Sequence, residues 1–178
     1  MNDATAIQLR LIGEIREALD TAGVAWWWYG GWAMDFHAGE VTRDHSDIEV
    51  FVWRRDAKVT SAAITAAGFA APPGLYPDEA QPFLKDAQEV GVWYLIRDAD
   101  DQICTPGRWA DWPWAPGSFD APRAQLGDIE APVMSVEGLL AMKLEFADQA
   151  HGAPLREKDL TDIARLRAII ASRSEDDW

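Results

Sequence analysis

The sequence predicts one α/β domain of the α+β type, and three observations lead to this expectation. The chain has 178 residues, close to the roughly 150 that one domain takes. Hydrophobic residues make up 48% of it and charged residues 26%, as in chains that fold around a buried core. Candidate strands alternate with helical segments early in the chain, whereas its end carries only helical patterns. We therefore expect a single domain over 1–178, with a sheet-containing part at 1–130 and a helical part at 131–178.

Hydrophobic spacing and glycine stop signals define the elements of the first part. Gly23 ends the first helix, and the pair Gly30 and Gly31 closes the aromatic run before the second. The predicted elements are, in order, a helix at 6–19, a strand at 24–29, a helix at 32–38, a strand at 48–53 and an Ala-rich helix at 57–67.

The remaining elements are a hairpin and a helix pair. Residues 92–97 and 102–105 flank an acidic turn and predict the hairpin. Prolines recur through 106–132, which predicts a loop or short irregular strands. Ser135 is typical of an N-cap for a helix to about 147, and a second helix is expected at 154–171.

The net charge and the cysteine content indicate which partners and which cellular compartment to expect. The chain has 30 Asp and Glu against 16 Lys and Arg, a formal net charge of −14, so we expect nucleic acid to be disfavoured and cations to be attracted. The single cysteine, Cys104, cannot form an internal disulfide, which favours a reducing cytoplasm. We expect neither a leader nor a membrane anchor, and the sequence leaves the oligomeric state open.

The segment 47–53 carries the clearest chemical signal. The two-residue period of a strand puts Asp47 and Glu49 on one face, followed by the apolar Phe51. Two carboxylates two residues apart can converge on a hard cation such as Mg²⁺, although an Asp-x-Glu pair on a solvated strand is common. The change to an apolar face at Phe51 favours a cleft over open solvent.

A glycine turn precedes this strand. Gly30 and Gly31 come directly before a helix, where unpaired backbone N–H groups can hold phosphate oxygens if no Cβ blocks close approach. Arg43, between the turn and the carboxylates, is a candidate phosphate donor or a surface cation.

Together these residues resemble the signature of the small aminoglycoside and lincosamide nucleotidyltransferases, which belong to the polymerase-beta-like superfamily. The resemblance rests on Tyr29-Gly30-Gly31-Trp32-Ala33-Met34-Asp35, Gly39, Thr42-Arg43, His45 and Asp47-Ile48-Glu49-Val50. It implies a nucleotidyltransferase fold, with a short mixed sheet flanked by helices. It also implies transfer of a nucleoside monophosphate from ATP or another NTP, with Gly30 and Gly31 on phosphate and Asp47 and Glu49 on Mg²⁺.

The chain departs from that pattern at two carboxylates. Glu49 stands where the family often has Asp, and the longer side chain can still ligate a metal. The third family carboxylate, on a neighbouring strand, has no clean counterpart at 92–106, and we expect Asp101 to replace it, ahead of Asp98 and Asp100. Without it the site would lack its general base.

Charges on the predicted helix pair suggest further contacts. Lys143 and Asp159 each lie on an otherwise apolar helical stripe, so Lys143 pairs with Asp159, reaches a bound phosphate, or extends to solvent. The segment 156–159 resembles a pattern in other nucleotidyltransferases in which lysine contacts the nucleotide, which implies nucleotide roles for Lys143 and Lys158.

The ten tryptophans fall into different settings. We expect the run Trp26-Trp27-Trp28 to be buried in the core. The proline-rich loop carries three more, Trp109, Trp112 and Trp114. Their rings are expected either to stack on a base or a sugar or to pack within the loop. The sequence thus favours a magnesium-dependent nucleotidyltransferase acting on a small cationic acceptor such as an aminoglycoside. A toxin-like transferase acting on tRNA or protein, and a nucleotide- or ligand-binding module without catalysis, remain the alternatives.

Overall fold

The computed structural model describes residues 2–149 and 151–176 and has the expected α+β architecture. Its helices are α1 (Asp3–Ala22), α2 (Gly30–Ala38), α3 (Ala57–Ala66), α4 (Val136–Glu145) and α5 (Glu157–Asp176). Its strands are β1 (Trp26–Tyr29), β2 (Asp47–Trp53), β3 (Ala80–Lys85), β4 (Gln88–Arg97), β5 (Ile103–Cys104), β6 (Ala124–Leu126) and β7 (Ile129–Ala131).

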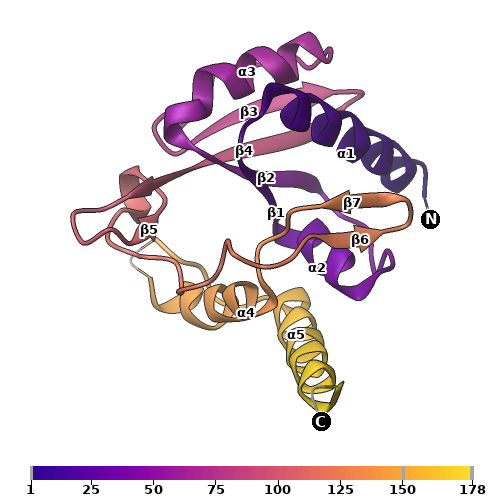
Figure 1. Ribbon diagram of the computed structural model, residues 1–178, viewed down its shortest axis with the longest axis vertical. Helices are drawn as coiled ribbons and strands as arrows, with labels where there is room; N and C mark the ends of the chain where they lie inside the picture. The colour runs from indigo at the N-terminus through magenta and orange to yellow at the C-terminus, as the bar shows by residue number, and fades with distance from the viewer. Residues whose placement is uncertain (1, 150, 177–178) are drawn as a thin grey trace.

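The main sheet is mixed, as the resemblance implied. Its strand order is β1-β2-β4-β3, with β5 pairing to the far end of β4. The central pair β2 and β4 is parallel, and β1 and β3 are antiparallel to their neighbours. Helices α1 and α3 pack side by side over the sheet, while α2 packs against β1 and β2 (Figure 1).

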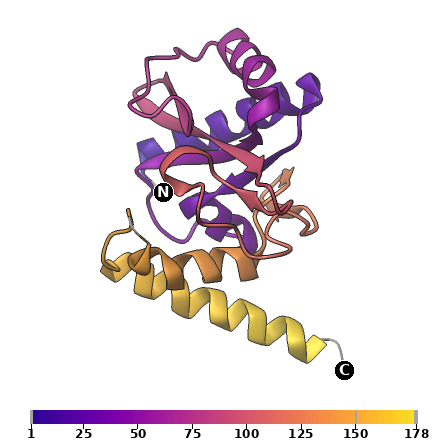
Figure 2. The same cartoon turned by 90° about the vertical axis from the view of Figure 1, so that its left-hand side faces the viewer.

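The C-terminal helices lie outside this sheet layer. Figure 2 shows α4 and α5 side by side below the sheet-containing part, and both helices contact α2. The Ser135 side chain caps α4 by accepting a hydrogen bond from the backbone N–H of Gly138, as expected. The second helix begins at Glu157, not at Pro154, so Pro154 lies in the connecting loop.

Sequence patterns found the buried elements better than the edges. Ile48, Val50 and Val52 are fully buried on one face of β2, as the two-residue period predicted. Strand β3 was missed because it contains Pro82, which an edge strand tolerates since its missing N–H breaks no inner ladder. The β3–β4 turn is formed by Asp86 and Ala87, both at positive φ, a turn that lacks the usual glycine signal.

The expected hairpin at 92–97 and 102–105 is present as the pairing of β4 with β5. The proline-rich stretch also holds a short hairpin, β6–β7, beside α2 (Figure 1). Cys104 is free and buried. Among the described helices, none has the length and apolar character that crossing a bilayer requires.

Candidate active site

A cleft of about 470 Å³ opens where the start of β2, the glycine turn and the helix pair meet. Drug-sized ligands occupy pockets of about 300–1,000 Å³. The cleft is lined by Asp47 and Glu49, by Gly30 and Gly31, and by the basic side chains Arg43, Lys143 and Lys158. Seven of the eight predicted site residues line the cleft, and Asp101 does not.

The carboxylate pair occupies the start of β2. Asp47 is exposed, whereas Glu49 is half-buried beneath it on the same face of the strand. Burial and the neighbouring Asp47 charge raise the pKa of Glu49 to about 7, while the Trp93 indole, Lys143 and Lys158 oppose that rise. Two carboxylates held this close favour a bound cation, because a cation removes both the burial cost and the repulsion.

The glycine turn lies directly against these groups. Gly30 has φ +66°, and a Cβ there would collide with the Glu49 carboxylate. A Cβ on Gly31 would collide with the His45 ring and come within 3.0 Å of Arg43 Nη2. The side chain of Tyr29 gives no N-cap hydrogen bond to α2, so glycine at both positions keeps the start of this helix open and close to Glu49.

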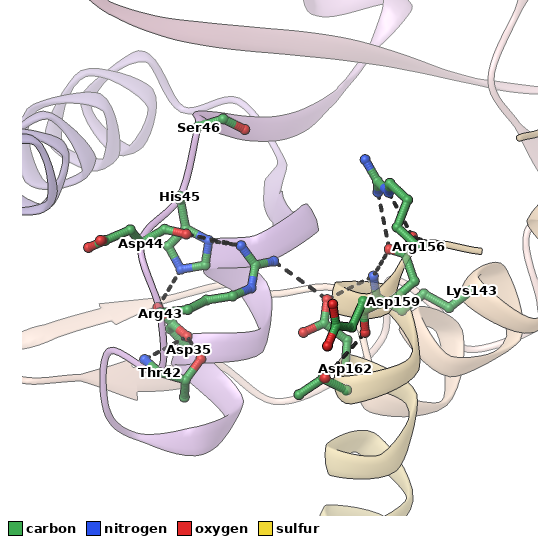
Figure 3. A network of polar contacts seen from close by, with 12 residues as sticks. Asp35, Thr42, Arg43, Asp44, His45, Ser46, Lys143, Arg156, Asp159 and Asp162 are labelled. Carbon is green, nitrogen blue, oxygen red and sulfur yellow. Dashed lines mark hydrogen bonds and ion pairs between the residues drawn. The ribbon is translucent and has the colours of Figure 1, made fainter. Parts of the chain in front are cut away.

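A network of polar contacts joins Asp35 of α2 and the segment 42–46 to the helix pair (Figure 3). His45 Nε2 lies 2.6 Å from Asp35 Oδ2, and Arg43 Nη1 lies 3.0 Å from His45 Nδ1. Because arginine has only donors, His45 Nδ1 must accept and Nε2 must donate its proton to Asp35. The imidazole is therefore fixed between its two partners, and it holds the Arg43 guanidinium beside Gly31.

The same network continues into α4 and α5. Arg43 Nη2 is 3.5 Å from Asp162 Oδ2, and Lys143 Nζ is 2.9 Å from that oxygen. Lys143 also donates to Asp159 Oδ1 at 3.1 Å, and Arg156 Nε is 2.7 Å from Asp159 Oδ2 (Figure 3). The pairing of Lys143 with Asp159, one of the sequence alternatives, is therefore present, while Lys158 is exposed with no ion pair among the described residues.

Aromatic side chains line another part of the cleft. We call Trp109, Trp112, Trp114 and Phe146 the aromatic cluster; its ring centroids lie 5.4–6.2 Å apart along the chain of contacts. The loop that carries it is anchored at Arg108, whose Nε and Nη2 bind the buried Glu79 carboxylate at 2.9 and 2.8 Å. The half-buried tryptophans pack on one another, as the loop-packing interpretation predicted, and they also border the cleft. Their stacking on a base or a sugar stays a prediction.

Asp101 is not brought to the cleft. It lies in the β4–β5 turn with its side chain 83% exposed, and its carboxylate is 3.4 Å from Arg97. Strand β4 instead places Gly91 and Trp93 opposite Glu49 and Phe51 of β2. The turn extends past the end of the strand, so its acidic residues project away from the carboxylate pair, and Asp98 and Asp100 are likewise outside the lining.

Several residues of the site carried no recognisable signal in the sequence. Asp162 binds Arg43 and Lys143 but lies 119 residues from Arg43 along the chain. Glu79 lies in a segment without a predicted element. Asp35 belongs to the motif of the resemblance, but its contact with His45 was not predicted. Trp93 was placed on a strand but not in the site. A buried acid on a helix is the one available hint, because such a group requires a partner.

The mixed sheet, with the glycine turn beside the carboxylate pair, has a nucleotidyltransferase-type fold, and solved structures agree on this fold. The crystal structure of ANT(2")-Ia in complex with adenylyl-2"-tobramycin superposes with a TM-score of 0.74 at 18% identity, covering 94% of this chain and 92% of that one. Lincomycin-bound LnuA, a lincosamide antibiotic adenylyltransferase, gives 0.68 at 20% identity, covering 94% and 99%.

The chain belongs to the aminoglycoside-2''-adenylyltransferase family, whose model matches residues 11–166. A 2''-aminoglycoside nucleotidyltransferase from Klebsiella pneumoniae is 28% identical over 106 residues, which are 58% of this chain and 51% of the relative. One from Escherichia coli matches to the same extent. The chain thus spans about half the length of the curated relatives it matches.

Proposed function

We propose that the protein is a magnesium-dependent nucleotidyltransferase that moves a nucleoside monophosphate from ATP or another NTP to a hydroxyl group of a small antibiotic acceptor. The observation that carries the proposal is the meeting of Asp47 and Glu49 with the glycine turn and with basic side chains in one cleft. Family membership supports it, as do relatives and neighbours named for nucleotidyl or adenylyl transfer to aminoglycosides and lincosamides.

The carboxylate pair fits Mg²⁺. Asp47 and Glu49 share a face of β2, and the pKa of Glu49 is raised by its burial and by the Asp47 charge, both of which a bound cation would offset. Over residues 2–149 and 151–176, no group of three His, Cys, Asp or Glu side chains is arranged to hold a metal. A magnesium ion needs no such set, because it often takes one or two carboxylates and completes its shell with water and substrate phosphates.

The other residues have separate tasks in this proposal. Backbone N–H groups at the glycine turn, with Arg43, Lys143 and Lys158, orient the triphosphate so that the acceptor oxygen lies in line with the α-phosphorus. His45 and Asp35 keep the Arg43 guanidinium in place. The aromatic cluster excludes water from the acceptor and fixes its position.

In the reaction, the acceptor oxygen forms a bond to the α-phosphorus, the bond to the bridging oxygen breaks, and pyrophosphate leaves. The proton of the acceptor hydroxyl is released to water. Bound Mg²⁺ would neutralise phosphate charge and lower the pKa of the acceptor hydroxyl. This contribution matters here because the remaining carboxylate of the cleft, Asp159, is already paired with Lys143 and Arg156. Positioning and electrostatics therefore supply most of the proposed rate enhancement.

Transfer of label from α-labelled ATP tests the proposal. With Mg²⁺ present, we expect label on a small acceptor from a panel of tobramycin, lincomycin and tRNA, and a loss of roughly 100-fold or more in Asp47→Asn. Asp128→Asn, in the exposed β6–β7 turn, is the matched control and should retain full activity. Asp101→Asn should also retain activity, because Asp101 lies outside the cleft.

Two results would contradict the proposal. Label on tRNA alone would favour a toxin-like transferase. Nucleotide binding with no transfer to any acceptor would favour a binding module, for which the missing third carboxylate is the motivating observation.

A further inference from the structure

Asp162 of α5 lies behind two of the basic side chains that line the cleft. Its side chain is 1% exposed and is not part of the lining, whereas Arg43 and Lys143 are. Oxygen Oδ2 of Asp162 lies 2.9 Å from Lys143 Nζ and 3.5 Å from Arg43 Nη2 (Figure 3). One oxygen of α5 therefore holds a cation from α4 and a cation from the segment before β2.

The two acidic residues that hold Lys143 use their oxygens differently. Asp159 Oδ1 accepts from Lys143 and Arg156, and its Oδ2 accepts from the backbone N–H and the side chain of Arg156. Asp162 Oδ1, in contrast, is buried and has no hydrogen-bond partner among the described residues. Such an oxygen costs folding free energy, because it has lost its water without a replacement. The fold thus accounts for Asp159, whereas Asp162 calls for a role beyond folding.

Both cations keep N–H donors for a ligand. A lysine ammonium has three donors, and Lys143 uses two of them on Asp159 and Asp162. An arginine guanidinium has five, and Arg43 uses three of them on its contacts within the network. Within the described part of the chain, at least one donor of each side chain is therefore left for the oxygen atoms of an anion in the cleft.

Among the described residues, Asp162 is the one that contacts both cations. Without it, Lys143 would stay bound to Asp159 and Arg43 to His45, with no contact that joins the two. A long side chain that is free before binding must be immobilised when the ligand arrives, which lowers the affinity. A shared anchor removes that cost in advance.

We propose that Asp162 is a positioning residue, which holds Arg43 and Lys143 at one oxygen so that their remaining N–H donors face the triphosphate of the nucleotide. This inference rests on the proposed function, since the triphosphate belongs to the donor substrate of that reaction. Asp162 does not touch the nucleotide and acts through the two cations.

The direction of the change in nucleotide affinity tests the inference. Removing a carboxylate that only neutralises the two cations would strengthen their attraction for phosphate. Removing a positioning residue weakens binding, because the ligand must then order both side chains. In calorimetry with Mg²⁺ and a non-hydrolysable ATP analogue, we expect Asp162→Asn to bind the analogue roughly tenfold more weakly than the wild type. Unchanged or tighter binding would overturn the inference.

Asp20→Asn is the matched control. Asp20 is also an ion-paired aspartate, with Arg16 and Arg123 as partners, but it lies outside the cleft, so its variant should bind the analogue as the wild type does. In the transfer assay, Asp162→Asn should raise the KM for ATP roughly tenfold and leave the acceptor KM constant. A matching rise in both KM values would indicate a general loss of structure and contradict the positioning role.

A second pair of variants keeps the test decisive if Asp162→Asn does not fold. Lys143→Gln/Asp162→Asn removes both partners of a buried pair, which a protein tolerates better than the loss of one. Asp162 still holds Arg43 in Lys143→Gln, so the double variant should bind the analogue about threefold more weakly than Lys143→Gln does. Equal affinities of these two variants would count against the inference.

Binding and transfer together separate this inference from the proposed function. Weaker analogue binding by Asp162→Asn, without transfer of label by the wild type, would leave the positioning role intact and refute nucleotidyl transfer. Transfer of label by the wild type, with equal analogue affinities of wild type and Asp162→Asn, would leave nucleotidyl transfer intact and refute the positioning role. A wild type that binds no analogue would refute both.

Discussion

Two parts of the cleft are built differently. One is the segment that carries the glycine turn and the carboxylate pair, and the other is the aromatic cluster. The first comes from one stretch of chain, β1 to β2, in which Tyr29 pairs with Glu49 across an antiparallel ladder. The second joins a proline-rich loop to Phe146 after α4, and it depends on a distant anchor at Glu79. The carboxylates and glycines proposed to hold metal and phosphate are thus local, whereas the aromatic cluster proposed to face the acceptor is assembled by tertiary contacts.

The largest loss of kcat is expected from Gly30→Ala, which alters the glycine turn beside Glu49. A Cβ at Gly30 strains a positive-φ residue and displaces the Glu49 carboxylate, and such a misplacement costs roughly 100-fold in kcat. Gly39→Ala is the control, because Gly39 has φ +73° but open space around its Cβ. Both variants should lose similar stability in urea, and an equal loss of kcat in both would show that strain alone is responsible.

The next effect concerns the pH dependence of stability without metal. The pKa of Glu49 rises from 4.5 to about 7 on folding, so the folded state binds its proton more tightly than the unfolded state does. The free energy of unfolding should therefore fall as pH rises from about 4.5 to 7, by at most about 3 kcal/mol. Urea titrations at pH 5 and 8 should show this fall in the wild type and not in Glu49→Gln.

The quantity to compare is the change in unfolding free energy between pH 5 and 8, in the wild type and in Glu49→Gln, because other groups titrate in the same pH range. Burial lowers the pKa of His37, which makes stability rise with pH through the same range. That contribution is shared by the wild type and Glu49→Gln and cancels. Parallel pH profiles of the two proteins would show that Glu49 is not buried as described.

The anchor of the aromatic cluster should give a smaller effect. Glu79→Gln removes the charge that the backbone N–H and the guanidinium of Arg108 bind, which we expect to cost about 2 kcal/mol of unfolding free energy. The acceptor KM should rise several-fold, while the KM for ATP stays constant. A matching rise in both KM values would show that the two parts of the cleft are not independent.

The smallest effect is expected at Lys158, which is exposed and without an ion pair among the described residues. An exposed charge contributes about 0.2–1 kcal/mol, so Lys158→Gln should raise the KM for ATP only a few-fold and leave kcat unchanged. The effect should shrink in high salt. A change in kcat would instead place Lys158 at the reacting phosphate.

The sequence predicted those site residues that lie close together along the chain better than those that lie far apart. Asp47, Glu49 and the glycine turn were predictable because strand periodicity and a positive-φ glycine are local properties. Asp101 was expected at the site because it follows β4 in sequence. The turn directs it into solvent, and no local pattern indicates which way a turn projects.

The sequence by itself determined the α+β elements, the acidic face of β2 and the glycines that allow close approach to it, because these follow from backbone geometry over a few residues. Only the tertiary structure decided that Asp162 and Asp159 neutralise Lys143, that His45 holds Arg43, and that Trp93 stands beside Glu49. Such pairings depend on which surfaces pack together, and packing is set by the whole core at once.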